Sequence, residues 1–166
     1  VHIEDQESPK RCGHLDGKSV VAPDEMVRKI MSAVDARTDD DFTIIVRTDA
    51  LAVTGWDDTL RRCEAYVEAG ADVLFVEALR EPDQVEWLAR NFDVPLLYNY
   101  VETGKSPLLS APELERMGFK IALFPVSALL VVTRAVTRLM HELKANGTTA
   151  HLLDDMAGLL ECFETV

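Results

Sequence analysis

Five short runs rich in Val, Ile, Leu and Phe recur along this chain of 166 residues, and longer amphipathic segments separate them. Runs that are apolar at successive positions indicate strands buried on both faces. Such strands joined by helices form a parallel sheet, because parallel neighbours require a crossover connection. The sequence therefore predicts an α/β fold with strands at 1–5, 42–49, 71–78, 94–100 and 120–126.

The segments between the strands carry signals for helix ends. One segment opens with Pro23 and two acidic residues, a composition that favours the first turn of a helix. Ser110 precedes another segment as a candidate N-cap, and Gly70 ends a third as a candidate C-cap. We expect helices at 23–38, 57–70, 81–92, 110–118, 127–147 and 151–163.

The later strands follow one another at the short interval of a (β/α)8 barrel, whereas a longer loop, 6–22, follows the first strand. Five strands cannot close a barrel that needs eight. Because Val1 already lies within a strand pattern, we expect the C-terminal part of a TIM barrel, strands four to eight with their helices, over 1–147. A helical extension, 148–166, would follow; an open α/β sheet is the alternative.

Polar side chains recur where the expected strands end. In a barrel these carboxyl ends open on one face, and active sites are built there. Each such residue alone could be a cap or a loop hydrogen bond, but their recurrence on successive strands predicts a site. The residues are Glu4, Asp5, Arg47, Asp49, Glu77 and Asn99.

Composition narrows the class of ligand. Lys and Arg number 17 against 29 Asp and Glu, a formal net charge of −12, which disfavours a nucleic-acid or anionic-membrane partner. No apolar run approaches the roughly 20 residues needed to span a bilayer. Three widely spaced cysteines, Cys12, Cys63 and Cys162, indicate neither a disulfide framework nor a CxxC metal site. We expect a cytoplasmic protein that binds a small anion where basic residues gather.

Basic residues gather around one thiol, in "PKRCGHLDGK" at 9–18. Lys10, Arg11 and His14 flank Cys12, and neighbouring cations lower the pKa of a thiol. The two glycines of the segment let the backbone turn tightly, so the loop could close over a substrate. A solvated basic loop with an incidental cysteine is the alternative interpretation.

"PKRCGH", preceded by "IEDQ" and followed by "IIVRTDA", "AGADVLFVEA" and "NYVETGKSPLLS", resembles the isocitrate lyase/phosphoenolpyruvate mutase superfamily, most of all its 2-methylisocitrate lyase branch. The resemblance runs from Val1 to about Ala145. It implies a barrel dependent on Mg²⁺ (or Mn²⁺), a homotetramer that exchanges its last barrel helix, and a small di- or tricarboxylate substrate. The implied reaction cleaves a 2-methylisocitrate-like 2-hydroxy acid into pyruvate and succinate.

The resemblance also implies roles for individual residues. Cys12 would protonate the carbanion left by bond cleavage, and Lys10 would tune its thiolate. Arg47 would hold the oxo-acid carboxylate and the developing oxyanion. Glu4 would reach the metal ion, a role suited to a carboxylate because Mg²⁺ prefers oxygen ligands. The implied substrate-binding residues are Arg11, Gly13, His14, Glu77 and Asn99.

The chain departs from the family pattern in two places. The aspartate pair that binds the metal, and the Ser-Gly element of the first βα-loop, would precede Val1. "NYVETGKSP" differs from the "NMVEGGKTP" of relatives at positions that include Tyr100 and Thr103. Three alternatives stay open: a carboxyphosphoenolpyruvate phosphonomutase, a relative that cleaves oxaloacetate or dimethylmalate, and a truncated half-barrel without catalysis.

Overall fold

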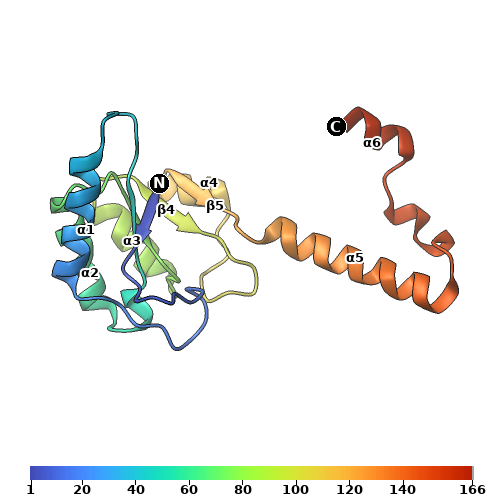
Figure 1. Ribbon diagram of the computed structural model, residues 1–166, viewed down its shortest axis with the longest axis horizontal. Coiled ribbons are helices and arrows are strands. Elements are labelled where there is room, and N and C mark those ends of the chain that lie inside the picture. The colour runs from blue at the N-terminus through green and yellow to red at the C-terminus, as the bar shows by residue number, and fades with distance from the viewer. Residues whose placement is uncertain (166) are drawn as a thin grey trace. The chain divides into compact units, whose positions relative to one another are not determined.

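A parallel sheet forms the centre of the computed structural model, which describes residues 1–165. Its strands are hydrogen-bonded in chain order, and every neighbouring pair is parallel, as the sequence predicted (Figure 1). The sheet does not close, so the fold is an incomplete barrel. The strands are β1 (His2–Glu4), β2 (Ile45–Thr48), β3 (Val73–Val76), β4 (Leu96–Asn99) and β5 (Ile121–Leu123).

A helix follows each strand, as in a βα-repeat. Ser110 caps one of them as expected: its N–H and hydroxyl lie 2.8 and 2.6 Å from Glu113 Oε2. The α-helices are α1 (Pro23–Ala36), α2 (Trp56–Glu68), α3 (Pro82–Asn91), α4 (Ala111–Met117), α5 (Ser127–Asn146) and α6 (Leu159–Thr165), and the 3₁₀ helices are η1 (Ala50–Ala52) and η2 (Ala150–Asp155).

The chain divides into two compact units at Pro125 and Val126. The first holds the sheet with α1 to α4. The second holds α5, η2 and α6, so α5 lies with the C-terminal segments in this division, although its sequence suggested that it belonged with 1–147. Within residues 1–165, no helix is long and apolar enough to cross a membrane.

The single helix predicted over 151–163 is wrong. The structure has η2 there, then an interruption, then α6. Met156 adopts an extended backbone after η2, and the N–H of Gly158 donates to Glu161 Oε2 at 3.2 Å, at the start of α6. The apolar spacing that suggested one helix therefore belongs to two short ones.

The two faces of the sheet bury different side chains, because neighbouring residues in a strand point to opposite sides. One face, which includes Val46 and Tyr98, packs with side chains of the helices in the main core. The other face forms a second, smaller cluster. That cluster contains Val73, Phe75 and Leu97, with Ile45 and Ile121 against it.

Candidate active site

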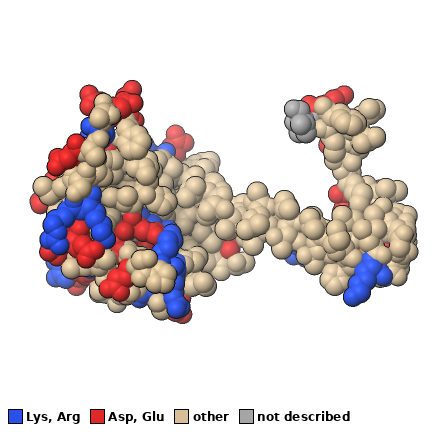
Figure 2. Space-filling view, viewed as in Figure 1, with Lys and Arg blue, Asp and Glu red and all other residues tan. Residues whose placement is uncertain are grey.

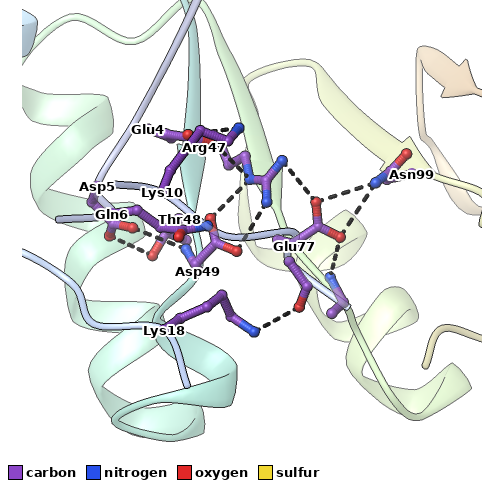
Figure 3. A network of polar contacts seen from close by, with 12 residues as sticks. Glu4, Asp5, Gln6, Lys10, Lys18, Arg47, Thr48, Asp49, Glu77 and Asn99 are labelled. Carbon is purple, nitrogen blue, oxygen red and sulfur yellow. Dashed lines mark hydrogen bonds and ion pairs between the residues drawn. The ribbon is translucent and has the colours of Figure 1, made fainter. Parts of the chain in front are cut away.

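Of the strand-end residues predicted to form a site, all but Asp5 lie together. Asp5 points to the opposite side of the sheet, toward Tyr66 of α2. By the alternation of side chains along a strand, Glu4, Arg47 and Asn99 share the face of the smaller cluster, and Glu77 follows β3 on that side (Figure 3). Glu4 is paired with Arg47 in the register of β1 and β2. The strand periodicity thus brings one polar side chain from each of four elements to a single place.

Arg47 lies at the centre of this group. Its Nε and Nη2 bind Asp49 Oδ2 and Oδ1 at 2.8 and 3.0 Å, a bidentate pair. Its Nη1 lies 3.1 Å from Glu77 Oε2, and its Nε lies 3.3 Å from Glu4 Oε2. Burial lowers the pKa of the Arg47 guanidinium, but the Asp49 hydrogen bonds and the charge of Glu77 outweigh it and raise that pKa. The guanidinium is therefore a fixed cation among three carboxylates.

Glu77 connects Arg47 with the cysteine-bearing loop. His14 Nε2 lies 3.0 Å from Glu77 Oε1, and Asn99 Nδ2 donates to Oε2 at 3.1 Å. Burial raises the pKa of the Glu77 carboxyl, but its contacts with His14 and Arg47 outweigh burial and lower the pKa below its usual value. Ala78, directly after Glu77, has a left-handed backbone with φ of 54° and donates its N–H to Glu77 Oε1 at 2.8 Å. Glu77 is thus held from several sides.

The loop docks on this network through a glycine. Gly13 is buried, and a β-carbon on it would lie 2.2 Å from Glu77 Cγ and 2.6 Å from Arg47 Nη2, so no side chain fits there. Lys18 Nζ donates to the carbonyl oxygens of Gly13 and Leu15 at 2.7 and 2.6 Å. Burial lowers the pKa of Lys18. This lysine holds the turn that presents Gly13 to the site.

His14 joins the loop to a second loop, 100–110. The backbone N–H of Lys105 donates to His14 Nδ1 at 2.9 Å, and Lys105 Nζ lies 2.5 Å from Asp16 Oδ1. Because Nδ1 accepts a hydrogen bond, the neutral imidazole carries its proton on Nε2, the nitrogen that faces Glu77. Both ring nitrogens therefore contact protein groups in this arrangement.

Cys12 is exposed on the loop, as a thiol that meets a substrate must be. Lys10, expected beside the thiol, places its Nζ 2.8 Å from Glu4 Oε1. Arg11 is exposed, and its backbone N–H and carbonyl pair with the side-chain amide of Gln6 at 2.9 and 2.8 Å. Lys10 thus links the loop to a sheet carboxylate, while Arg11 keeps its guanidinium toward solvent.

Three members of this network were not assigned a role from the sequence. Asp49, two residues after Arg47, is the carboxylate that holds the guanidinium. Lys18 and Lys105 fix the two loops. The spacing of "RTD" was a usable signal for Asp49, since i and i+2 lie on one side of an extended chain. Lys18 binds carbonyl oxygens within its own loop, whereas Lys105 joins two loops, a contact that no local pattern reveals.

One side chain here suits a hard metal ion. Within residues 1–165, no three His, Cys, Asp or Glu side chains are placed to hold a metal together. Glu4 Oε2, however, is buried without a hydrogen-bond partner, although Arg47 Nε lies 3.3 Å away. Arg47 contacts three carboxylates, and Lys10 is a second cation at one of them, so the carboxylates still outnumber these two cations. A bound metal ion would offset the remaining negative charge. The residues therefore fit one carboxylate arm of a Mg²⁺ site.

A parallel, incomplete barrel that carries an arginine and carboxylates at its strand ends, beside a cysteine-bearing loop, defines the class of α/β proteins related to TIM barrels. The family described as phosphoenolpyruvate phosphomutase matches residues 1–144. The chain therefore belongs to the phosphoenolpyruvate mutase/isocitrate lyase superfamily, as the sequence resemblance indicated.

Proteins similar to this chain in sequence and in structure include lyases. The chain is 43% identical to 2-methylisocitrate lyase of Escherichia coli (strain K12) over 166 residues, which is 100% of this chain and 56% of that protein. A crystal structure of 2,3-dimethylmalate lyase is 38% identical, with a TM-score of 0.88 over 98% of this chain and 55% of that one. A crystal structure of phosphonopyruvate hydrolase in complex with oxalate and Mg²⁺ is 27% identical, with a TM-score of 0.78 over 98% and 56%. The chain thus spans about half the length of these relatives.

Proposed function

We propose that the protein carrying this chain is a Mg²⁺-dependent carbon–carbon lyase that cleaves a 2-methylisocitrate-like 2-hydroxy acid into pyruvate and succinate. The observation that carries the proposal is the exposed Cys12 on a loop whose next residue, Gly13, is seated against Arg47 and Glu77. The identity with 2-methylisocitrate lyase supports this choice of substrate.

The reaction requires a cation that binds the substrate carboxylate and an acid that protonates the carbanion formed on cleavage. As the carbon–carbon bond breaks, its electron pair stays on the carbon that becomes part of succinate. The hydroxyl loses its proton to water as its carbon becomes the oxo carbon, and a proton from water would later restore the Cys12 thiol. The Cys12 thiol would deliver a proton to the carbanion. Each terminal nitrogen of Arg47 has a second N–H beyond its contacts with Asp49 and Glu77, so the guanidinium would also bind a substrate carboxylate.

Loop contacts would fix the substrate between these groups. We assign substrate binding to Gly13 and His14, which line the docked loop, and to Asn99, whose buried Oδ1 has no hydrogen-bond partner. Arg11, exposed at the loop surface, would meet a distal carboxylate. Glu77 would hold Arg47 and His14 in place, because it contacts both.

Glu4 would hold Mg²⁺ through Oε2, which accepts no hydrogen bond although Arg47 Nε lies 3.3 Å away. When bound, the ion would supply Lewis-acid polarisation of the substrate hydroxyl oxygen. Lys10, which binds the other oxygen of Glu4, would orient that carboxylate and connect it with the loop. Among residues 1–165, Glu4 is not part of any group of three metal-binding side chains, so we assign it a single coordinating arm.

The test assays the purified protein with Mg²⁺ on 2-methylisocitrate, 2,3-dimethylmalate, oxaloacetate and phosphonopyruvate, with pyruvate release as the main readout. We expect 2-methylisocitrate to be the best substrate. Cys12→Ser should abolish pyruvate release yet keep oxalate binding by calorimetry, because the serine hydroxyl is a far weaker acid than the thiol. A Cys12→Ser protein with wild-type turnover would end the proposal.

Cleavage of 2,3-dimethylmalate is the second candidate, and the structural similarity to 2,3-dimethylmalate lyase favours it. The same panel separates it from phosphonate chemistry of the carboxyphosphoenolpyruvate phosphonomutase kind. A non-catalytic half-barrel is the remaining reading, since the chain spans about half of its relatives. It predicts neither turnover nor oxalate binding.

We also propose that the protein assembles as a cytoplasmic homo-oligomer by helix exchange. Many apolar side chains of the second unit are exposed, and Figure 2 shows that residues other than Lys, Arg, Asp and Glu cover most of its visible surface. Light scattering after gel filtration would test the assembly, with Val131→Glu expected to weaken it. The exposed residues of α5 include Leu129, Leu130, Val131, Val132, Val136, Met140 and Leu143.

A further inference from the structure

Asp5, which the sequence placed among the site residues, lies behind the site on the helix side of the sheet. It follows Glu4, so its side chain points to the opposite side of the sheet, toward the helices, and it is fully buried. Its carboxylate accepts hydrogen bonds from both neighbouring layers. The donors are Asp49 N–H (2.9 Å), Thr48 Oγ1 (2.7 Å), Tyr66 OH (2.9 Å) and Arg62 Nη1 (3.3 Å).

On the sheet side, these contacts control the residue that holds Arg47. Asp5 Oδ1 binds the backbone N–H of Asp49, and Asp5 Oδ2 binds the hydroxyl of Thr48. Asp49 then binds the Arg47 guanidinium with both of its own oxygens. Because a bidentate pair tolerates little displacement, the backbone position of Asp49 determines where the guanidinium lies.

On the helix side, the same carboxylate reaches the end of loop 6–22. Arg62 of α2 donates through Nη1 both to Asp5 Oδ2 and to the carbonyl of Val21, the latter at 2.9 Å. The backbone carbonyl of Asp5 accepts the N–H of Val21 at 2.8 Å. The loop that carries the thiol is therefore fastened to Asp5 where it rejoins the first helix (Figure 3 shows Asp5 beside Thr48 and Asp49).

A purely stabilising role does not account for this arrangement. Asp5 is fully buried, and a carboxylate is costly to keep in the core. A buried ion pair of this kind is commonly no more stabilising than well-packed apolar residues. What distinguishes the Asp5 carboxylate is that four donors, from the sheet and from α2, converge on it at the place where the loop returns.

We propose that Asp5 is a positioning residue that fixes the Arg47 guanidinium through Asp49 and fixes the returning end of loop 6–22 through Arg62 and Val21. The proposal extends the proposed function, since Arg47 is there the substrate-carboxylate ligand. Its prediction concerns the placement of Arg47, which can be observed without turnover.

The test compares Asp5→Asn with Asp58→Asn in the whole protein. Asp58 binds the same Arg62, through Nε at 2.7 Å, but lies on α2 away from Asp49, so it is a matched control. The first readout is hydrogen exchange of the Arg47 Nε–H by ¹⁵N NMR. The second is oxalate affinity by calorimetry, and the third, where turnover is found, is kcat and KM.

In Asp5→Asn, an amide NH₂ group replaces one of the two acceptor oxygens, so a donor then faces the donors that surround this side chain. We expect Arg47 Nε–H exchange to accelerate about tenfold or more and oxalate to bind about tenfold more weakly, the size of one hydrogen bond to a charged group. KM should rise more than kcat falls, and Asp58→Asn should leave all readouts within about twofold. Unchanged Arg47 exchange in Asp5→Asn, or an equal change in Asp58→Asn, would overturn the proposal.

Thr48→Val keeps the test decisive if Asp5→Asn does not fold. It removes one donor to Asp5 and retains shape, and it should accelerate Arg47 Nε–H exchange partway. No acceleration would reject the proposal. If the wild-type protein binds no oxalate and turns over no substrate, the proposed function fails, while the exchange of Arg47 still decides the role of Asp5.

Discussion

Gly13 approaches Glu77 so closely that a β-carbon on the glycine would fall 2.2 Å from Glu77 Cγ. Gly13→Ala should therefore lift the cysteine-bearing loop from the site, because Glu77 is held by other contacts and cannot retreat. We expect a loss of about 1–3 kcal/mol in the free energy of unfolding, the usual cost of overpacking, and about tenfold weaker oxalate binding. Urea unfolding and calorimetry measure the two effects.

Gly158→Ala is the control for this change. A β-carbon there would meet nothing within 4 Å, and Gly158 has no positive φ. It should leave unfolding and oxalate binding unchanged within error. Wild-type behaviour of Gly13→Ala in both measurements would show that the loop is not seated on Glu77 in solution.

Thr103 adopts a left-handed backbone with φ of 62°, which is costly for a β-branched residue. The position is also one where the chain departs from the "GG" of the related sequences. Thr103→Gly should raise the free energy of unfolding by about 0.5–1 kcal/mol, since the relieved strain exceeds the added entropy of the unfolded glycine. Thr38, exposed in another loop without a positive φ, is the control, and Thr38→Gly should instead destabilise. Equal effects of the two changes would contradict the expectation.

The cysteines should differ sharply in reactivity. Cys12 and Cys162 are exposed, whereas Cys63 is fully buried and burial raises the pKa of its thiol. In native protein at pH 8, a disulfide reagent should titrate Cys12 and Cys162 quickly and reach Cys63 after unfolding. Cys12→Ser should remove one fast equivalent. A fast phase that is unaltered in Cys12→Ser would mean that the Cys12 thiol is not accessible to the reagent in the folded protein.

Asp58 gives a pH dependence of stability. Burial raises the pKa of its carboxyl, but the hydrogen bonds from Thr54 and Arg62 outweigh burial and lower the pKa to about 2. A depressed native pKa adds stability above the unfolded value of 3.8, and that stability is lost as pH falls from 3.8 toward 2. Asp58→Asn should be destabilised by about 1 kcal/mol at pH 7, and this difference should shrink below pH 4 in urea unfolding. A constant difference across this range would refute the assignment.

Much of the fold could be predicted because the buried strands of a parallel sheet appear in the sequence as short continuous apolar runs. Each strand is apolar on both faces, so the runs around Val46 and Leu74 stand out without knowledge of their neighbours. The failure over 151–163 has an equally local cause. Apolar residues recur at helical spacing there, but Gly158 and the extended Met156 interrupt the helix, and spacing alone does not register a break.

The residues of the candidate site could likewise be predicted where they lie on strands, but their contacts between loops could not. Glu4, Arg47 and Asn99 were identified because strand ends converge and alternate residues share a face. The contacts of Lys105 with His14 and Asp16 join segments roughly 90 positions apart. Such contacts depend on how two loops fold back over the sheet, and loop paths are set by tertiary packing instead of by periodicity.

Glu4 and Asp5 are adjacent, yet one faces the site and the other faces α2. A one-residue insertion within β1 would exchange the two carboxylates between the sides of the sheet, because strand side chains alternate. Such a variant could retain its hydrogen-bonded ladder and still lose both the metal arm and the anchor for Arg47. We therefore expect an insertion in β1 to destroy the site, whereas the exposed turn at 38–42 should accept added residues.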